Sequence, residues 1–428
     1  MTAAVGPTCA LPDTPLAAAV PGIMTCVHCG FCLQACPTYL ALGDENDSPR
    51  GRILLMRSLV EGTLGIDDPD VHTHIDQCLG CRGCETACPS GVPYGHLLEA
   101  TRATIALARP LPLVARLILR IFERPHLLAA MLAGARLLRA TRLPRLLGRL
   151  PGRLGFAMAM LAATEGRVPH RPYTRRGTGA RGATAVLRGC VMRGLYAETN
   201  RATERTLRAN DYQVVDVAGQ QCCGALHAHA GDLEGARRLA RVNIAAFERS
   251  ALSFIAVNAA GCGAMMKEYG HLLASDPVWA ERAAAVSAKV RDATELLADA
   301  GPARGASLPL AITYDAPCHL LHAQRLVRPP LAVLGAIPDL EIVPLTDTDQ
   351  CCGAAGIYNL LEPEVSGLVL TPKLANISAT GAELVATGNP GCQMQIGAGM
   401  LRTRTGRGTV HPIDLLDASY SRAERSPT

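Results

Sequence analysis

The chain has 428 residues, of which 49% are hydrophobic and 18% are charged, and its formal net charge is +5. This composition excludes an intrinsically disordered chain, which would need low hydrophobicity and high net charge. Nearly all the positive charge is arginine, and no basic stretch has interleaved aromatic residues, so nucleic-acid binding is not expected. At about 150 residues per domain, the length predicts roughly three domains.

The N-terminal residues lack the features of a secretory signal. Residues 1–25 contain no lysine or arginine, and four prolines interrupt their apolar residues. No later stretch of about 18 or more uncharged apolar residues predicts a membrane-spanning helix. We therefore expect a cytoplasmic protein, with a peripheral position on the inner face of the cell membrane as a second location. In a reducing compartment the 17 cysteines indicate metal binding or redox chemistry rather than disulfides.

Two cysteine runs with the same spacing lie in the first hundred residues. The first is Cys26, Cys29, Cys32 and Cys36, followed by Pro37, and the second is Cys78, Cys81, Cys84 and Cys88, followed by Pro89. This C-x2-C-x2-C-x3-C-P spacing is typical of bacterial ferredoxins, and it predicts two [4Fe–4S] clusters. Paired zinc sites are the alternative, because C-x2-C pairs also bind zinc, but the repetition of four cysteines with a following proline disfavours them.

The spacing also predicts how the cysteines are shared. Three cysteines in one tight loop bind three corners of a cluster, and the fourth lies about one helical turn further along and points toward the other cluster. We therefore predict one cluster on Cys26, Cys29, Cys32 and Cys88, and another on Cys36, Cys78, Cys81 and Cys84. Gly30, Gly80 and Gly83 would let backbone N–H groups approach the sulfur atoms.

The segment between the two runs is longer than a minimal ferredoxin needs, and Leu54–Val60 has a helical pattern. We therefore predict a helical two-cluster domain over residues 21–100. We interpret Arg50 and Arg52 as capping a helix that begins near Ile53. The alternative is that they donate hydrogen bonds near a cluster or contact a partner.

The segments on either side of this domain carry weaker signals. Residues 1–20 are rich in proline and are predicted to be a disordered tail, in which Cys9 is a free thiol without a role. Residues 101–180 are predicted to be a helical connector rich in arginine and leucine. Residues 102–153 contain eleven arginines and one acidic residue, and prolines divide them into short helices. We interpret these arginines as solvated; the alternative is a docking face for a membrane surface or a partner.

The remaining eight cysteines form an internal repeat. Cys190, Cys222, Cys223 and Cys262 recur as Cys318, Cys351, Cys352 and Cys392, at offsets of 128 to 130 residues. The sequence Gln-Cys-Cys-Gly-Ala occurs in both copies. The repeat predicts two tandem homologous domains over residues 181–305 and 306–428, with a boundary in the Gly/Pro/Ala stretch 301–308.

Each repeat alternates strand-like and helix-like segments. The predicted strands are Ala185–Leu187, Gln213–Val217 and Phe254–Val257, and then Ala311–Tyr314, Glu341–Pro344 and Glu383–Ala386. This alternation predicts α/β modules with parallel sheets, and hence a multidomain chain of α plus α/β class. The four cysteines of each module would meet at the carboxyl ends of the strands, where open sheets bind ligands.

The adjacent cysteines predict a further metal site in each module. Neighbouring residues of a strand point to opposite faces, whereas in a loop Cys222 and Cys223 can face one centre if Gly224 supplies the turn, and Gly353 is the counterpart of Gly224. We expect one further iron–sulfur cluster or one zinc ion per module, since soft thiolates bind both. A redox-active set of thiols without metal is the third interpretation.

Four histidines lie close to these cysteines in the sequence: His227, His229, His319 and His322. We interpret them as lining a polar loop. The alternative is that they ligate a metal or move protons.

Three segments, Cys26–Tyr39, Asp47–Ile53 and Cys78–Val92, resemble the iron–sulfur subunit of glycolate oxidase (glycolate dehydrogenase). The repeats resemble its CCG domains, and similar domains occur in heterodisulfide reductase, in anaerobic glycerol-3-phosphate dehydrogenase and in lactate-utilisation proteins. Many CCG domains end in Cys-x2-Cys, whereas Met265 and Gln395 stand at the last position here. Four thiolates per module instead of five argue against the non-cubane cluster of heterodisulfide reductase.

The resemblance implies the iron–sulfur electron-transfer subunit of a flavin-dependent glycolate (2-hydroxy acid) dehydrogenase. In such a hetero-oligomer, FAD-containing subunits would oxidise glycolate to glyoxylate, and this chain would pass electrons toward a quinone or another acceptor. No catalytic residue is expected in this chain, which has no G-x-G-x-x-G motif after a strand. The alternatives are a catalytic heterodisulfide-reductase-like subunit, an electron-transfer subunit of a glycerol-3-phosphate or lactate dehydrogenase, and a non-catalytic zinc scaffold.

Overall fold

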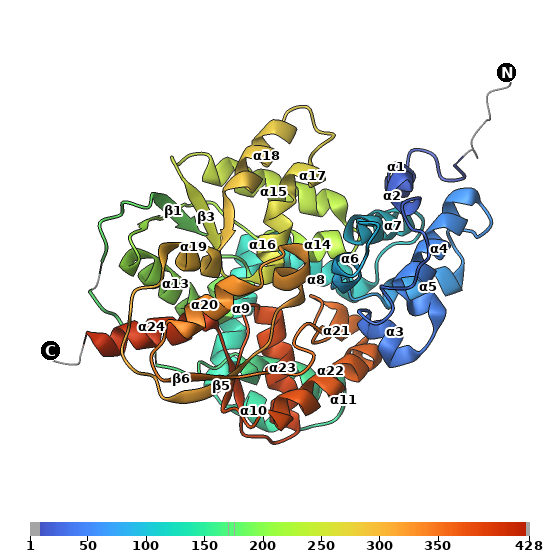
Figure 1. Cartoon of the computed structure of the whole chain (residues 1–428). Helices are drawn as coiled ribbons and strands as arrows, with labels where there is room; N and C mark the ends of the chain where they lie inside the picture. Colours follow the sequence, from blue (N-terminus) through green and yellow to red (C-terminus); the bar gives the residue numbers. More distant parts are fainter. Residues whose placement is uncertain (1–8, 170, 175, 425–428) are drawn as a thin grey trace.

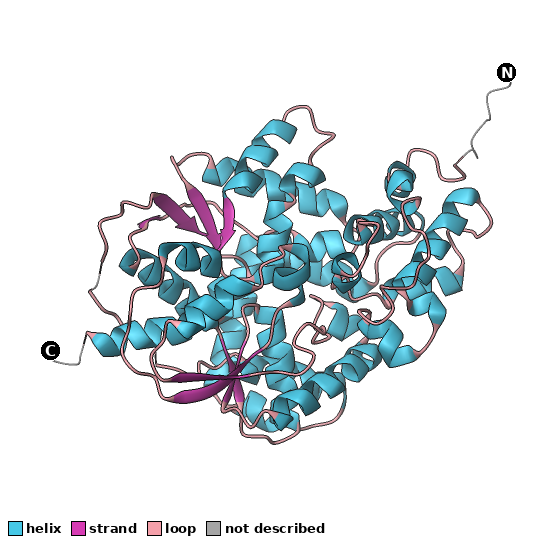
Figure 2. Ribbon diagram, in the orientation of Figure 1, coloured by secondary structure: helices cyan, strands magenta, loops and turns pink. Residues whose placement is uncertain are grey.

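The computed structural model describes residues 9–169, 171–174 and 176–424. Helices dominate the molecule, and two small sheets lie in its C-terminal half (Figure 2). In Figure 1 the N-terminal helices lie at one side of the molecule and the two sheets lie toward the other side. None of the helices in these residues has the length and apolar character needed to span a bilayer.

The first hundred residues are helical and contain no strand at the described positions. Their elements are α1 (Pro15–Ala18), α2 (Val20–Ile23), α3 (Pro37–Leu42), η1 (Glu45–Asp47), α4 (Pro49–Glu61), α5 (Pro69–Asp76), α6 (Gly83–Thr86) and α7 (Tyr94–Ala108). Proline begins α3, α4 and α5, at a position where its missing N–H group costs no hydrogen bond. The predicted helical character of this part is confirmed.

The prediction of a disordered tail over residues 1–20 is wrong for residues 15–18. Residues 1–8 lie outside the described part of the chain, but Pro15–Ala18 form a helix capped by Thr14. Leu16 is fully buried in the core that α4 and α7 also line, and Cys9 packs against the same core. Proline at the first helical position starts a helix here and is not a sign of disorder.

The N-terminus of α4 differs from the expectation. The helix begins at Pro49, and the cap is Ser48, whose side chain accepts a hydrogen bond from the Gly51 N–H group. The interpretation that Arg50 and Arg52 cap a helix beginning near Ile53 is therefore wrong. Arg50 instead pairs with Glu45 at the surface.

A buried ion pair joins several elements of the N-terminal part. The Arg52 guanidinium is fully buried and lies 3.0 Å from the Asp47 carboxylate. It also donates hydrogen bonds to the His74 carbonyl oxygen at 2.6 Å and to Thr38 Oγ1 at 3.0 Å. One side chain on α4 thus holds α3, η1 and α5 together, beside the Cys36 thiol 4.0 Å away.

The connector consists of four further helices: α8 (Leu113–Glu123), α9 (Pro125–Ala140), α10 (Leu143–Leu147) and α11 (Gly152–Ala163). A proline stands at or directly beside the first residue of each helix: Pro112, Pro125, Pro144 and Pro151. This confirms that the prolines divide the segment into short helices. The last of them, α11, packs against α23 (Pro390–Arg402) of the second repeat.

Each repeat contains a four-stranded parallel sheet. The first has β1 (Ala183–Val186), β2 (Gln213–Val215), β3 (Phe254–Val257) and β4 (Val290–Asp292) in the order β2-β1-β3-β4; the second has β5 (Leu310–Tyr314), β6 (Leu340–Val343), β7 (Leu384–Ala386) and β8 (Gly408–Val410) in the order β6-β5-β7-β8. The six predicted strands are confirmed. The edge strands β4 and β8 were not predicted, because neither contains an apolar run.

Helices connect the strands of each sheet. The first repeat has α12 (Val191–Leu195), α13 (Ala197–Ala209), α14 (Ala225–His229), α15 (Leu233–Phe247), α16 (Ala260–Lys267), α17 (Tyr269–Leu272), α18 (Ala280–Lys289) and α19 (Ala293–Ala300). The second has η2 (His319–Ala323), α20 (Arg328–Gly335), α21 (Tyr358–Leu361), α22 (Pro363–Ala379), α23 and α24 (Pro412–Ala423). Both modules are therefore α/β, as predicted.

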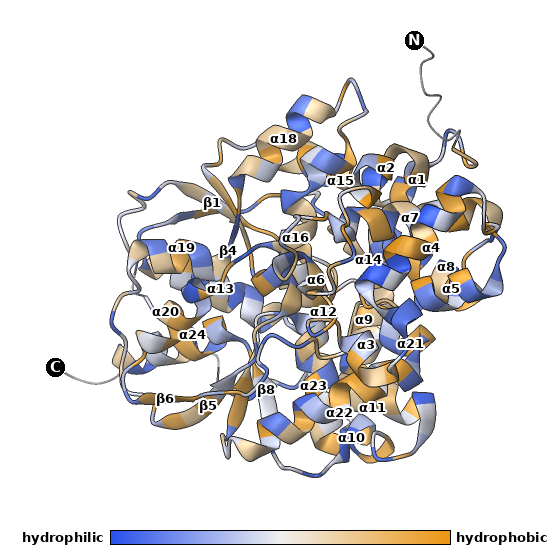
Figure 3. Cartoon of the chain, turned by 45° about the vertical axis from the view of Figure 1, so that its right-hand side comes forward, coloured by the Kyte–Doolittle hydropathy of each residue, from blue (hydrophilic) through white to orange (hydrophobic). Residues whose placement is uncertain are grey.

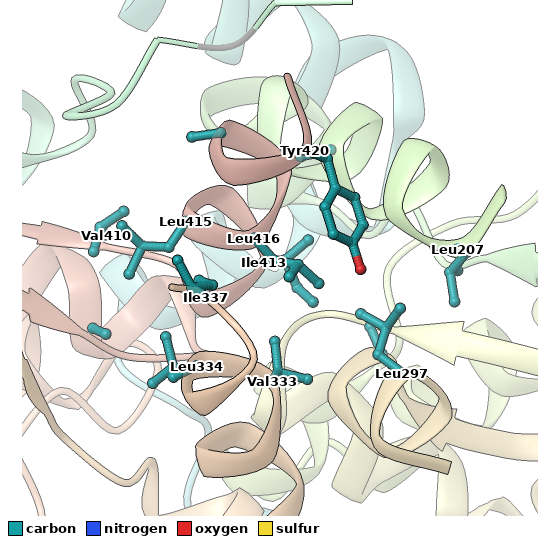
Figure 4. Close-up of a cluster of buried hydrophobic side chains, with 14 of the residues drawn as sticks. Leu207, Leu297, Val333, Leu334, Ile337, Val410, Ile413, Leu415, Leu416 and Tyr420 are labelled. Carbon is teal, nitrogen blue, oxygen red and sulfur yellow. The ribbon is translucent and has the colours of Figure 1, made fainter. Parts of the chain in front are cut away.

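The two repeats share one apolar core. Leu207 and Leu297 of the first repeat pack in the same cluster as Val333, Ile413 and Leu416 of the second, as Figure 4 shows. Helix α13 packs against α24, and α19 packs against α20. The sheets are thereby held in a fixed relation to each other, which sets where their carboxyl ends lie.

Replacing Arg52 by leucine is expected to destabilise the N-terminal part by about 3–5 kcal/mol, because the buried Asp47 carboxylate loses its cation. Hydrogen–deuterium exchange over α4 and α5 measures this loss. The matched control is Arg57→Leu, which removes an exposed pair with Glu61 on the same helix, worth about 0.3–0.5 kcal/mol. Equal exchange rates in the two variants would show that the buried pair has no special role.

Candidate metal centres

The eight N-terminal cysteines line two cavities. The first cavity is lined by Cys26, Cys29, Cys32 and Cys88, and the second by Cys36, Cys78 and Cys81, while Cys84 lines both. The fourth cysteine of each run therefore lies at the cavity of the other run. This is the arrangement that crossed sharing of the cysteines requires, and the assignment of ligands stays a prediction.

Hydrogen-bond donors surround the sulfur atoms of the second cavity. The Gly80 N–H group and the Tyr94 hydroxyl donate to Cys78 Sγ at 3.4 Å and 3.6 Å. Thr38 Oγ1 lies 3.3 Å from Cys36 Sγ. Gly80 has a φ of 61°, a left-handed conformation that favours glycine. Such donors stabilise negative charge on sulfur and would tune the potential of a bound cluster.

Burial makes these thiols hard to ionise. It raises the pKa of Cys32 to about 11 and raises the pKa of Cys81 and Cys84 well above the ordinary value of a thiol. Neighbouring cysteines add to the effect, since each thiolate disfavours the next. A bound metal centre is the partner that deprotonates such groups. Four soft sulfur donors around one cavity fit an iron–sulfur cluster.

The first repeat gathers its four cysteines at the carboxyl ends of β1, β2 and β3. Cys190 Sγ and Cys222 Sγ are 3.7 Å apart, and the thiol of Cys223 interacts with those of Cys222 and Cys262. The hydrogen bond with Cys222, followed by burial, raises the pKa of Cys190 well above its usual value. The predicted convergence of these cysteines at strand ends is confirmed.

The second repeat repeats this arrangement. The thiol of Cys351 interacts with those of Cys318 and Cys352, and the thiol of Cys352 interacts with that of Cys392. The hydrogen bond with Cys351, followed by burial, raises the pKa of Cys318. Asn389 Nδ2 donates to Cys392 Sγ at 3.4 Å. Each repeat therefore offers four converging sulfur atoms.

Glycine makes the turn that brings adjacent cysteines to one centre. Gly224 and Gly353 have φ values of 91° and 83°. The Gly353 N–H group donates to Cys351 Sγ at 3.4 Å. A Cβ atom on Gly353 would lie 2.7 Å from the Ser366 carbonyl oxygen, so no side chain fits there. The predicted role of these glycines in the turn is confirmed.

The residues at the fifth-cysteine position are buried and belong to the packing of each module. Met265 lies in the apolar core of the first repeat. Gln395 is fully buried; its amide oxygen accepts from Asn359 Nδ2 and its amide nitrogen donates to Ser366 Oγ, both at 2.8 Å. Each module therefore has four thiols at its centre and a non-thiol side chain at the fifth position.

Two charged residues beside the second module's cysteines were not among the predicted site residues. Lys373 Nζ lies 3.1 Å from Asp315 Oδ1, and both side chains are almost completely buried. The lysine also donates to the Asp347 carbonyl oxygen at 2.8 Å. The first module has no such pair at the corresponding positions. Leu187 precedes Cys190 by the same number of residues as Asp315 precedes Cys318, and Asn243 precedes Cys262 by the same number as Lys373 precedes Cys392. The sequence feature that could have identified Lys373 as a site residue is its rarity, since it is one of only three lysines in an arginine-rich chain.

The second module adjoins the N-terminal cysteines. Cys318 and Cys351 pack in the same apolar cluster as Cys81 and Leu79. The Tyr358 hydroxyl donates to the Gln77 carbonyl oxygen at 2.8 Å, and α3 packs beside α22 (Figure 1). A cysteine of the second N-terminal cavity, Cys81, is thus packed with two cysteines of the second module, Cys318 and Cys351.

The candidate histidines lie where the modules and the N-terminal part meet. The rings of His229 and His319 stack with centroids 5.2 Å apart. His319 Nε2 lies 3.2 Å from the Gly80 carbonyl oxygen, and burial lowers the pKa of His319 to about 3. His322 Nδ1 lies 2.8 Å from Thr86 Oγ1. These contacts favour the interpretation that His319 and His322 line polar contacts between modules.

His227 is different, because its side chain is completely buried. Burial lowers its pKa, so the ring is neutral near pH 7. His227 lies in α14, the short helix that begins directly after Gly224 and the adjacent cysteines.

Comparison with known proteins agrees with this geometry. Residues 22–92 match the model of the 4Fe-4S dicluster domain, and residues 184–267 and 312–397 match the model of the cysteine-rich domain CCG. The chain is 37% identical to the probable glycolate oxidase iron-sulfur subunit of Bacillus subtilis, over 92% of this chain and 93% of the relative. It is 33% identical to the glycolate oxidase iron-sulfur subunit of Escherichia coli, over 94% of this chain and 95% of the relative.

A more distant relative, the lactate utilization protein A of Exiguobacterium sp., is 29% identical over 55% of this chain and 96% of its own length. The chain thus has two cysteine-lined cavities in its dicluster domain and one group of four cysteines in each CCG domain. Its relatives are named for glycolate oxidase and for lactate utilization. The chain belongs to the family of glycolate oxidase iron–sulfur subunits and is an iron–sulfur electron-transfer subunit of an oxidoreductase.

Proposed function

We propose that this chain is the iron–sulfur subunit of a flavin-dependent glycolate dehydrogenase complex that oxidises glycolate to glyoxylate. FAD-containing subunits would hold the substrate, and this chain would pass electrons toward a quinone or another acceptor. The names of the relatives at 37% and 33% identity support glycolate as the substrate. A related 2-hydroxy acid, lactate, is the second candidate, because of the shorter match to lactate utilization protein A.

The observation that most supports an electron-transfer role is that a cysteine of the N-terminal part packs with cysteines of the second repeat. Cys81 packs with Cys318 and Cys351 in one apolar cluster, whereas purely structural metal sites would not need to adjoin one another. When bound, iron–sulfur clusters would supply one-electron acceptor sites at these positions. We also propose that the chain is divided into a two-cluster domain at residues 21–100, a connector at 101–180 and two CCG domains at 181–305 and 306–428.

The chain's own residues would hold and tune these sites. Cysteine thiolates would be the ligands, and the Gly80 N–H group and the Tyr94 hydroxyl would stabilise negative charge on Cys78 Sγ. Arg52 lies beside Cys36, and Lys373 interacts with Cys351 and Cys352. Fixed positive charge near a centre favours its reduced, more negative form.

The flavin requirement is tested by comparing the isolated chain with the complex. Oxidation of a hydroxy acid removes two electrons together, and that chemistry belongs to a flavin or nicotinamide cofactor. We expect the chain to co-purify with flavoprotein subunits, and the complex to reduce an artificial dye with glycolate. The chain alone should give no dye reduction above background. Turnover by the flavin-free chain, or turnover of the complex with lactate or glycerol 3-phosphate but not with glycolate, would contradict the proposal.

The crossed sharing of cysteines is tested by single replacements in the full chain. We propose that Cys36 serves the second N-terminal cluster, since it lines that cavity. Cys36→Ser should alter the same electron paramagnetic resonance signal as Cys81→Ser, and Cys26→Ser should alter the other. Cys9→Ser is the matched control and should retain all iron. If Cys36→Ser reproduces the spectrum of Cys26→Ser, the assignment is uncrossed.

The content of the CCG modules is tested by metal analysis. We propose a further iron–sulfur cluster on Cys190, Cys222, Cys223 and Cys262, and another on Cys318, Cys351, Cys352 and Cys392. The anaerobically reconstituted chain should then hold more than the roughly eight irons of two [4Fe–4S] clusters. Cys222→Ser and Cys351→Ser should each lose iron and sulfide. One zinc ion per module, with iron unchanged in both variants, would exclude these clusters.

A further inference from the structure

The cysteine-lined sites form a row that ends at the surface of the N-terminal part. Cys84 lines both N-terminal cavities, and Cys81 of the second cavity packs with Cys318 and Cys351 of the second module. The first N-terminal cavity is therefore the outer end of this row. At that end lies Cys29, the one exposed cysteine among the seventeen, all of which are described. A redox partner that exchanges electrons with this end of the row has to approach the surface around Cys29.

Large apolar side chains stand exposed in the loop that carries Cys29. Met24, Val27 and Phe31 are exposed by 59%, 67% and 69%. Leu54 on α4 is exposed as well, and we call the exposed side chains of residues 24–34 together with Leu54 the N-terminal face. Figure 3 shows α2 and α4, which adjoin this loop, on the side of the molecule away from the two sheets. Exposed apolar side chains that gather in one place mark interaction sites.

The loop of the N-terminal face has no charged residue. Residues 21–34 contain no aspartate, glutamate, lysine or arginine, although 18% of the whole chain is charged. Arg50 contacts the loop, but its charge is balanced by Glu45 at 2.6 Å. Permanent interfaces have apolar cores that are depleted of charge and enriched in aromatic residues and methionine, whereas encounters between freely diffusing proteins are steered by charge. The N-terminal face therefore has the composition of a permanent interface.

Arg50 fixes the shape of this loop. Its Nη1 atom donates to the His28 carbonyl oxygen at 3.3 Å, and His28 and Gly30 have left-handed φ values of 53° and 85°. A Cβ atom on Gly30 would lie 2.9 Å from the same Nη1 atom, so a side chain there would push the guanidinium away. Leu54 lies one helical turn beyond Arg50, on the same side of α4. A loop that is already ordered loses little conformational entropy when a partner binds.

A protein subunit fits this face better than a small-molecule acceptor does. Small molecules bind in concave sites that enclose most of their surface, whereas the side chains of the N-terminal face stand exposed. Charge complementarity requires a partner whose own contact surface is apolar and uncharged. A subunit that carries flavin and stays bound to this chain meets that requirement, and it is the electron donor in the function proposed above.

We propose that the N-terminal face is the docking surface for the FAD-containing subunit. This inference rests on the proposed function, and it places the partner at the outer end of the row of cysteine-lined sites. The first N-terminal cavity would then be the site nearest to the flavin, and the cysteines of the second module would lie further along the row.

The test is co-purification of the tagged full chain with its flavoprotein subunits. Met24→Glu/Phe31→Glu introduces two carboxylates at positions that do not line the first cavity. The flavin retained per chain should fall by about tenfold or more, because a carboxylate buried at the interface would lack a partner. The unmodified complex should keep its flavin at high salt, which screens charge pairs. Hydrogen–deuterium exchange over residues 24–34 should be slower in the complex than in the chain alone.

The matched control is Val278→Glu/Val327→Glu, which replaces apolar residues of the repeats that are exposed by 65% and 55% and should retain flavin fully. Iron content and electron paramagnetic resonance check the N-terminal clusters, and Leu54→Glu repeats the test outside the cysteine loop. Full retention by Met24→Glu/Phe31→Glu and by Leu54→Glu would overturn the docking surface and leave the proposed function intact. Equal loss in the control, or dispersal of a dimer of this chain as the only effect, would also overturn it. An unmodified chain without any flavoprotein would contradict the proposed function as well.

Discussion

The structure depends on keeping sixteen cysteine side chains together in four groups, where all except Cys29 are buried or half-buried. Burial disfavours the thiolate form of each side chain, and each thiolate disfavours its neighbours. The cations beside the thiols, such as Arg52 and Lys373, are each paired with an aspartate and therefore offset the thiolate charge only in part. The free energy that holds the thiols in place therefore comes from the surrounding fold and from whatever centre they bind.

Much of the fold and the site could be predicted because both follow from local spacing. The cysteine runs, the Cys-Cys-Gly turns and the apolar runs each occupy a few consecutive residues. The edge strands β4 and β8 were missed because neither contains an apolar run, and they are strands only through pairing with β3 and β7. Lys373 was missed as a site residue because its partner, Asp315, is far away in the sequence and meets it only in the folded chain.

The two repeats have diverged while keeping their cysteines. The second has the Asp315–Lys373 pair at its centre and packs against the N-terminal cysteines. The first has Leu187 and Asn243 instead, and its cysteines lie next to α9 of the connector. The two similar groups of thiols thus have different electrostatic surroundings and different neighbours, so that any clusters bound to them would differ in potential.

The core shared by the two repeats bears on the order in which the chain can mature during synthesis. Because α24 packs against α13, a helix that leaves the ribosome late in the second repeat covers an early helix of the first repeat. Until residues 412–423 emerge, Leu207 and Leu297 lack part of their cover, and such exposed surface promotes aggregation or chaperone binding. A truncation that removes α24 would therefore damage the first repeat as well as the second.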